Sequence, residues 1–247
     1  MESLIGYQLA DSVATVTMDD GKVNVLSLRM IHDVSLALDR ALDDAAVVVV
    51  LAGRPGVFSA GFDLPVLRAG GPNANSMLRA GFDLAERVLS YPRPVVIACT
   101  GHAIAMGAFL LLSGDYRVGA AGQYKITANE VAIGVTMPWA AVEICRQRLI
   151  PAHFNRAVIL AEQYQPDSAV EAGFLDRTCE AADFWDAVRG ITGELAKLDL
   201  DAHKATKLRA RSSALAAIHD AIVADYAALA ERDHAAAAVA TAEARSA

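Results

Sequence analysis

Residues 46–64 read AVVVVLAGRPGVFSAGFDL, and this stretch decides the fold class. Its first part, residues 47–51, is a continuous valine and leucine run, typical of a strand buried on both faces of a parallel sheet. Glycine and proline at positions 53–56 then predict a loop. The small residues at 59–61 would let a ligand approach the main chain, and Asp63 can cap a following helix. Free N–H groups at such a turn can stabilise an oxyanion, although an ordinary strand–loop–helix connection has the same pattern.

A second unit of the same kind follows about fifty residues later. The apolar run at residues 94–99 predicts another buried strand, and residues 101–108, GHAIAMGA, lead into an apolar helix that begins near Met106. If the two turns meet in space, they offer two N–H donors. Two donors are the minimum for holding the enolate oxygen of a thioester or ester.

The rest of the chain alternates strands and helices as far as residue 126 and is mostly helical afterwards. Alternating residues at 7–10 and 13–18 predict a strand pair, and Ser27 can cap a helix with an apolar face. Helices are predicted near 77–89 and, after Trp139, at 139–149, 151–161, 166–172 and 183–198. We therefore expect an α/β core over residues 1–195 and a helical C-terminal section over residues 196–247.

Composition excludes several classes of protein. The 247 residues carry a net charge of −7, which argues against a general nucleic-acid binder. The three cysteines are far apart and form neither a metal motif nor a disulfide framework, so a reducing cytoplasm is expected. No basic, apolar leader starts the chain, and the apolar stretch at 103–112 is too short to span a bilayer. The expected protein is cytoplasmic, without a membrane or nucleic-acid partner.

One carboxylate falls in a region otherwise poor in charge. Glu130 lies in the segment ANEVAIG at residues 128–134, beside an apolar run. A carboxylate in an apolar pocket has a raised pKa and becomes a useful base near neutral pH. Taken alone, the same residue could also be an ordinary exposed glutamate.

Together these segments resemble the enoyl-CoA hydratase/isomerase (crotonase) superfamily over residues 5–195. The resemblance rests on residues 54–64, RPGVFSAGFDL, on residues 101–108, and on Gly114-Asp115-Tyr116-Arg117. It implies a crotonase-like spiral of repeated ββα units with a helical C-terminal section that completes the pocket, often in a neighbouring subunit. It also implies a homotrimer or hexamer acting on an acyl-CoA thioester, with no metal or redox cofactor and with CoA as part of the substrate.

Carried over by position, the resemblance implies a set of site residues. The backbone N–H groups of Phe62 and Met106 would be the oxyanion donors, and Glu130 the acid/base. CoA would lie along residues 22–25 and 60–62, and Lys204 or Lys207 would face its phosphates. The full set of expected substrate-binding residues is Lys22, Val23, Ala60, Gly61, Phe62, Met106, Gly107, Phe109, Pro138 and Trp139.

Departures from the family pattern indicate which reaction to expect. Hydratases of the family use two glutamates; Phe109 stands at the position of the first, and Glu130 matches the second. Single-glutamate members include Δ3,Δ2-enoyl-CoA isomerases, which this chain resembles in the spacing of Pro138 after Glu130. The sequence therefore predicts an isomerase that moves a 3-enoyl double bond to the 2 position. An enoyl-CoA hydratase and a catalytically silent acyl-CoA-binding protein are the alternatives.

Overall fold

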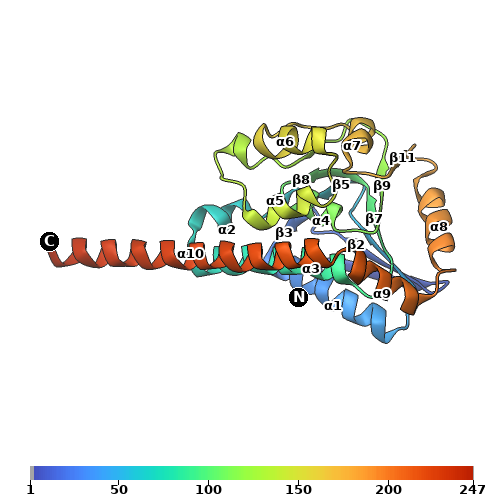
Figure 1. The fold of residues 1–247 in the computed structure, drawn as a ribbon, viewed down its shortest axis with the longest axis horizontal. Helices are drawn as coiled ribbons and strands as arrows, with labels where there is room; N and C mark the ends of the chain where they lie inside the picture. Colours follow the sequence, from blue (N-terminus) through green and yellow to red (C-terminus); the bar gives the residue numbers. More distant parts are fainter. Residues whose placement is uncertain (1–2, 247) are drawn as a thin grey trace.

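The computed structural model describes residues 3–246, with side chains as far as residue 231, and is built around a six-stranded sheet (Figure 1). The strand order is β1-β2-β4-β7-β9-β11. Strands β1 and β2 are antiparallel, and every other neighbouring pair is parallel. The strands are β1 (Ile5–Ala10), β2 (Val13–Met18), β4 (Val48–Ala52), β7 (Val95–Cys99), β9 (Tyr116–Ala120) and β11 (Arg177–Cys179).

A second, smaller sheet is formed by strands that come, along the chain, immediately after strands of the large sheet. Strands β5 (Gly56–Ser59), β8 (Gly101–Ile104) and β10 (Ile126–Thr127) are parallel, in the order β10-β8-β5. Each follows directly on a strand of the large sheet, so the chain repeats strand, strand, helix. A third sheet pairs β3 (Val25–Leu26) with β6 (Gly61–Phe62). The crotonase-like spiral of ββα units with a helical C-terminal section is confirmed.

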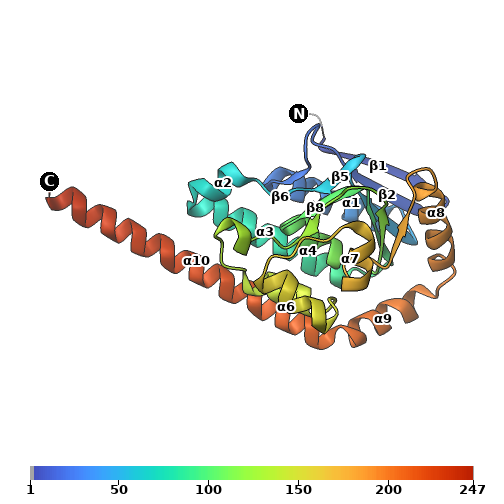
Figure 2. The ribbon, with the colours of Figure 1, turned by 90° about the horizontal axis from the view of Figure 1, so that it is seen from above.

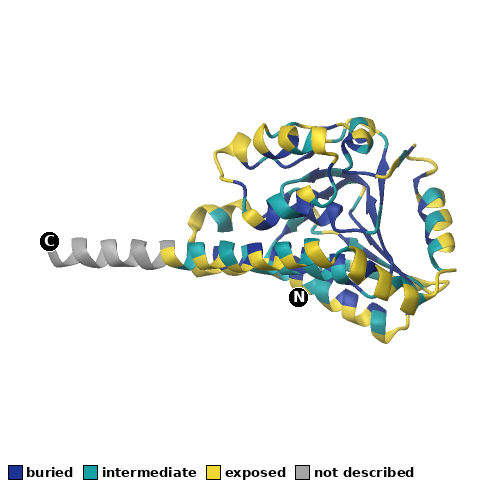
Figure 3. Cartoon of the chain, viewed as in Figure 1, coloured by how far each residue is buried: buried dark blue, intermediate teal, exposed yellow. Residues whose placement is uncertain are grey.

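The predicted core strands are buried because both faces of the large sheet are covered. Every residue of β4 and β7 is buried, as their continuous apolar runs predict (Figure 3). Helix α1 (Leu28–Asp43) buries the face that includes Met30, and Ser27 caps it by accepting a hydrogen bond from Met30 N at 3.2 Å. Helix α4 (Met106–Leu112) is buried on all sides, as its lack of polar residues predicts.

The four helices predicted after Trp139 begin within one residue of the predicted positions, whereas the helix predicted near 77–89 begins at Gly71. Asp63 caps α2 through Val66 N, as predicted. In Figure 2, α2 and α8 lie on opposite sides of the sheets. The helices are α2 (Leu64–Ala69), α3 (Gly71–Ser90), α5 (Trp139–Arg146), α6 (Pro151–Ile159), α7 (Pro166–Ala172), α8 (Phe184–Leu195), α9 (Leu200–Ala210) and α10 (Ser212–Ser246).

Helix α10 lies along α3 and α5 of the same chain (Figure 1). Its buried residues Ile218 and Ile222 fix it to the core. Residues 212–231 have the length and the mean hydropathy of 1.3 that would allow them to cross a membrane, and 17% of that segment is buried. Core helices of soluble proteins pass the same test, and the sequence analysis, which considered residues 103–112, did not single out this segment.

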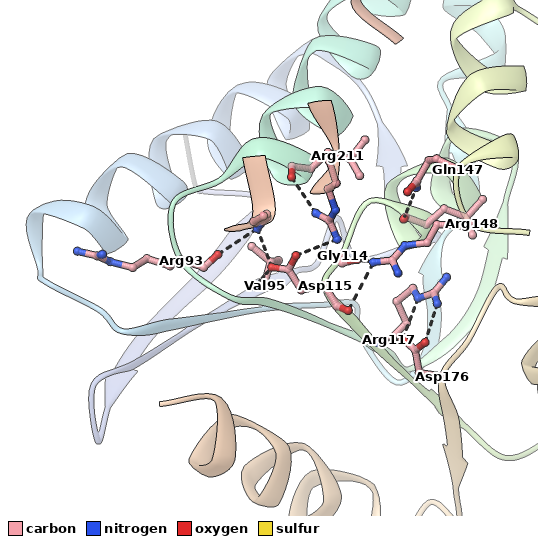
Figure 4. A network of polar contacts seen from close by, with 12 residues as sticks. Arg93, Val95, Gly114, Asp115, Arg117, Gln147, Arg148, Asp176 and Arg211 are labelled. Carbon is pink, nitrogen blue, oxygen red and sulfur yellow. Dashed lines mark hydrogen bonds and ion pairs between the residues drawn. The ribbon is translucent and has the colours of Figure 1, made fainter. Parts of the chain in front are cut away.

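A buried ion-pair network ties the helical C-terminal section to the sheet (Figure 4). Asp115 accepts hydrogen bonds from Val95 N and Lys207 Nζ, both at 2.7 Å, and pairs with Arg211 at 3.0 Å. Only 4% of the Lys207 side chain is exposed. The expectation that Lys207 faces CoA phosphates is therefore wrong, because its ammonium group is buried in an ion pair with Asp115.

Candidate active site

Three predicted site residues follow the ends of three neighbouring parallel strands. Phe62 is three residues beyond the end of β5 at Ser59, Met106 is two beyond β8 at Ile104, and Glu130 is three beyond β10 at Thr127. Because the carboxyl ends of parallel strands share one edge of a sheet, the topology gathers these residues at that edge. Ligands of α/β proteins bind at such edges.

Two buried polar side chains, those of Asn24 and Ser59, hold the first loop in place through hydrogen bonds. Asn24 donates from Nδ2 to Met18 O at 2.9 Å and to Phe58 O at 3.2 Å. The Ser59 hydroxyl donates to Asn24 O at 2.7 Å and accepts from Gly61 N at 3.1 Å. Both side chains are fully buried, so the loop backbone is fixed before any ligand arrives.

The two loops touch each other through glycines. Gly61 has a φ of +88°, and a Cβ there would lie 2.8 Å from Ile104 O and 3.3 Å from Met106 N. A Cβ at Gly107 would lie 2.4 Å from Ser59 O. A side chain fits at neither position, so the predicted meeting of the two turns is a consequence of these two glycines.

The backbone N–H of Met106 is the first N–H group of helix α4. The N–H groups of Ala108 and Phe109 both donate to Ala105 O, at 2.8 and 3.1 Å. Helix geometry supplies no intrahelical acceptor for the first residue of a helix, which leaves Met106 N to another partner. Ala105 reaches this turn with a φ of 53°, an unusual value for a residue with a Cβ.

Glu130 is buried among apolar neighbours. It is 8% exposed, and burial raises the pKa of its carboxyl to about 7, with its own backbone N–H opposing part of the shift. Its Oε2 atom has no hydrogen-bond partner among the residues that the structure describes. Burial raises the pKa of the Cys145 thiol, which is fully buried, and the negative charge of Glu130 raises it further. Glu130 is therefore poised to gain or lose a proton near neutral pH.

Phe109 belongs to a cluster of three aromatic rings. It is 1% exposed and stacks on Phe82 of α3, with 6.2 Å between ring centroids. Phe82 in turn meets the ring of Phe62 edge-on at 6.1 Å. The position where a hydratase would have its first glutamate is thus occupied by an apolar, tightly packed side chain.

A cavity of about 380 Å³ adjoins this cluster. Phe82 forms one part of its wall, and the segment after Glu130, which includes Pro138 and the largely exposed Trp139, forms another. Val135 connects this wall to Glu130 by donating from its backbone N–H to Glu130 O at 2.9 Å. The full lining is Leu67, Leu78, Arg79, Phe82, Val135, Thr136, Met137, Pro138, Trp139, Ile222, Asp225, Tyr226, Ala228 and Leu229.

Only part of the ranges expected along CoA is exposed, and Gly61 and Phe62 are buried. Lys22 and Val23 are exposed, and Val23 O accepts from Ala60 N at 3.0 Å. Arg54 donates from Nη1 to Lys22 O at 3.2 Å. Lys204 is exposed on α9. These contacts give residues 22–25 and 60–62 a shared, ordered surface.

Several residues of the site were not predicted from the sequence. Phe82 acts through packing and has no local signal. Asn24 falls within the range 22–25 expected along CoA, but its role in holding the first loop through buried hydrogen bonds was not predicted. Asp225 carries no local signal at all, because its partners on α5 are 85 or more residues away.

The family model for enoyl-CoA hydratase/isomerase matches residues 8–238. The chain belongs to the enoyl-CoA hydratase/isomerase family. A probable enoyl-CoA hydratase, EchA17 of Mycobacterium avium, is 29% identical over 167 residues, which are 66% of this chain and 64% of that relative. The match therefore spans slightly less than two thirds of the length of that relative.

Solved structures of the family match over more of the chain. An enoyl-CoA isomerase of Mycobacterium tuberculosis is 47% identical, with a TM-score of 0.88, over 92% of this chain and 99% of the other. The enoyl-CoA hydratase EchA3 of Mycobacterium marinum is 48% identical, with a TM-score of 0.87, over 91% and 98%. Because similar family members have been called both isomerase and hydratase, the reaction has to be argued from the residues of this chain.

Proposed function

We propose that this family member is a 3-enoyl-CoA to 2-enoyl-CoA isomerase in which Glu130 is the single acid/base. The proposal rests on two observations: Glu130 is buried with its Oε2 atom unpartnered among the described residues, and an apolar, buried Phe109 stands where a second carboxylate is expected. The Glu130 pKa of about 7 suits a group that must both take up and release a proton.

In the proposed mechanism, the thioester oxygen accepts hydrogen bonds from Phe62 N–H and Met106 N–H. The Glu130 carboxylate removes a proton from C2, and the electron pair delocalises into a dienolate whose negative oxygen the two N–H groups stabilise. The protonated Glu130 then returns its proton to C4 as the double bond forms between C2 and C3. Atoms and charge balance, and the step requires neither a metal nor a redox cofactor.

Proton transfer from C2 to C4 fits a single carboxylate, whereas hydration benefits from two. Adding water requires one group to orient and activate the water and another to protonate carbon. Among the cavity-lining residues that the structure describes, Asp225 is the one that carries a carboxylate. Both of its oxygens already accept hydrogen bonds from backbone N–H groups. Hydratase activity is the second candidate, favoured by the names of the curated relatives.

The test is to incubate the protein separately with a 3-enoyl-CoA and a 2-enoyl-CoA and to follow the absorbance of the conjugated thioester. A rise with the first substrate supports isomerisation, and a fall with the second supports hydration. Glu130→Gln should lower the isomerisation rate about 10²–10⁴-fold, the usual range for acid–base catalysis. Binding of acyl-CoA without either absorbance change would indicate a silent binding protein.

The proposal also includes the expected setting of the enzyme. CoA would lie along residues 22–25 and 60–62, and the chain would assemble as a homotrimer or hexamer in the cytoplasm. Exposed apolar side chains such as Ile133 (51% exposed) and Leu160 (71% exposed) support an assembly that covers them. Light scattering coupled to size-exclusion chromatography tests this directly, and a monomeric mass would contradict it.

A further inference from the structure

The carboxylate of Asp20 gathers three backbone N–H groups of the segment that follows it. Its Oδ1 accepts hydrogen bonds from Lys22 N at 2.7 Å and from Asn24 N at 2.9 Å. Its Oδ2 accepts a hydrogen bond from the backbone N–H of Val25, the first residue of β3, at 3.0 Å. A single side chain therefore closes the turn formed by residues 21–25.

These contacts take the place of a regular backbone pattern at this turn. Gly21 has a φ of 74° and Asn24 a φ of 53°, both in the left-handed region. Such residues continue neither a helix nor a strand, so the N–H groups around them need side-chain acceptors. Asn24 also returns the contact, because its Oδ1 accepts a hydrogen bond from Asp20 N at 3.1 Å. The two side chains thus fix each other's backbone.

Asp20 is held in its ionised form although it is partly buried. Burial raises the pKa of its carboxyl, but the three N–H groups and the positive charge of Arg54 outweigh burial and lower the pKa below its ordinary value. Hydrogen bonds to an ionised acceptor are stronger than those to a neutral one. The carboxylate therefore holds the turn more firmly than a neutral side chain of the same length would.

The turn that Asp20 closes is bonded to the first loop of the candidate active site. Val23 O accepts a hydrogen bond from Ala60 N at 3.0 Å. Asn24 O accepts a hydrogen bond from the Ser59 hydroxyl at 2.7 Å. A displacement of the turn would therefore displace the loop as well.

The strand that Asp20 holds pairs with the strand that carries the first proposed oxyanion donor. Strands β3 and β6 are parallel, with Val25 opposite Gly61 and Leu26 opposite Phe62. Each strand has two residues, so this pairing has little length with which to resist a shift of Val25. Asp20 is thus connected to the Phe62 N–H through Val25 and the β3–β6 pair.

We propose that Asp20 is a positioning residue that sets the place of the Phe62 N–H through the turn at residues 21–25 and the β3–β6 pair. Both of its carboxylate oxygens accept backbone N–H groups, so it acts through the backbone and not on the substrate. The inference rests on the proposed role of the Phe62 N–H as an oxyanion donor. It is independent of the choice between isomerisation and hydration.

The carbonyl stretching band of a bound thioester tests the position of the donors without catalysis. Octanoyl-CoA, labelled with ¹³C at the thioester carbonyl, is saturated and can be neither isomerised nor hydrated. Hydrogen bonds to the carbonyl oxygen weaken the C=O bond and lower its stretching wavenumber. Infrared difference spectra are recorded with the full-length protein in excess over the ligand, and the unlabelled ligand identifies the band. The native protein should shift the band to a lower wavenumber than that of free octanoyl-CoA.

Asp20→Ala should lose about half of this shift, because one of the two donors is displaced and the Met106 N–H is not. Turnover of the enoyl-CoA substrate at saturation should fall about 10–10²-fold, as expected for a small misplacement of a reacting group.

Asp20→Asn separates the contacts of the carboxylate. Its amide oxygen can still accept from Lys22 N and Asn24 N, but its NH₂ group would face Val25 N. The band shift and the turnover should therefore lie between those of Asp20→Ala and the native protein. This variant also tests the inference if the alanine variant does not fold.

Asp19→Ala is the matched control. The Asp19 side chain is 54% exposed, accepts from Gly21 N at 2.9 Å and pairs with Arg54 at 3.6 Å, and both partners lie outside β3. Its band and its turnover should be those of the native protein. Urea unfolding of each variant shows whether a loss of turnover follows stability instead.

A shifted native band that stays unchanged in Asp20→Ala and Asp20→Asn would overturn this inference alone, whatever the stability of the variants. So would an equal loss of the shift in Asp19→Ala. A native band at the position of the free ligand, or no bound ligand, would overturn the proposed function as well, so the two failures are distinguishable.

Discussion

Gly61 and Met106 are so close that a Cβ on Gly61 would lie 3.3 Å from the Met106 backbone nitrogen. The two residues are on different turns of the spiral, after β5 and after β8. Their contact is what brings two potential N–H donors to one place. The separation of these loops is therefore sensitive to a single added methyl group.

Gly61→Ala should consequently reduce isomerisation more than it reduces stability. The alanine would require a φ of +88° and would meet Ile104 O at 2.8 Å, so the two loops must move apart. Losing one oxyanion donor typically costs about 10²–10³-fold in turnover. Turnover and urea unfolding are measured together, with Gly134→Ala, at an open surface position with a φ of +76°, as the control for backbone strain alone. Equal turnover losses in both variants would contradict the explanation.

The pH dependence of the reaction should report the buried carboxylate. Glu130 must be ionised to remove a proton from C2, and burial raises its pKa to about 7. We expect kcat/KM to rise with pH, about tenfold per pH unit below 7, and to level off above it. A profile with its midpoint near 4.5, the ordinary value for glutamate, would contradict a raised pKa of the catalytic carboxyl.

Glu130→Gln should be more stable than the native protein at alkaline pH. Between pH 4.5 and about 7 the folded protein keeps a proton on Glu130 that the unfolded chain has released, so native stability falls as pH rises through this window. Above it the full cost, on the order of 3 kcal/mol, is present, and glutamine avoids it. Urea unfolding at pH 8 should show the difference, and at pH 4.5 it should largely disappear. A pH-independent difference would contradict this origin.

Phe109→Ala should destabilise the fold by about 3–5 kcal/mol, because it removes a fully buried ring that stacks on Phe82. Phe109→Leu, which keeps much of the volume, should cost considerably less. If Phe109 has no part in proton transfer, the pH midpoint of kcat/KM should be the same in both variants and in the native protein. A shifted midpoint in Phe109→Leu would contradict a purely apolar role.

Asp115→Asn should cost about 3–5 kcal/mol of stability, because it leaves the buried Lys207 ammonium without its carboxylate. Glu194→Gln breaks the exposed pair with Lys197, whose side chains are 74% and 68% exposed, and should cost well under 1 kcal/mol. Thermal or urea unfolding of the two variants compares them. Similar losses would show that the Asp115 network is not a stabilising junction.

Much of the fold could be predicted because its signals are local. The valine runs predict β4 and β7, Ser27 predicts the start of α1, and the helices after Trp139 were located to within a few residues. The sequence pattern indicates loops where the short strands β5, β6 and β8 form, and it gives no signal for β11. Strands of two to four residues carry no periodic pattern, and they form because neighbouring segments supply hydrogen-bond partners. Helix α3 begins at Gly71, earlier than its apolar periodicity indicates.

The sequence by itself determined the identity of the chemical groups. Its small residues at 59–61, its single Glu130 and the phenylalanine at position 109 identify the family and restrict the chemistry. Only the tertiary structure decided how those groups behave, because a pKa, a cavity and an ion pair depend on neighbours that are distant in sequence. Burial shifts the pKa of Glu130, Asp115 pairs with the buried Lys207, and Asp225 of α10 accepts hydrogen bonds from the first N–H groups of α5. No local pattern encodes these contacts, since each exists only when separate segments pack together.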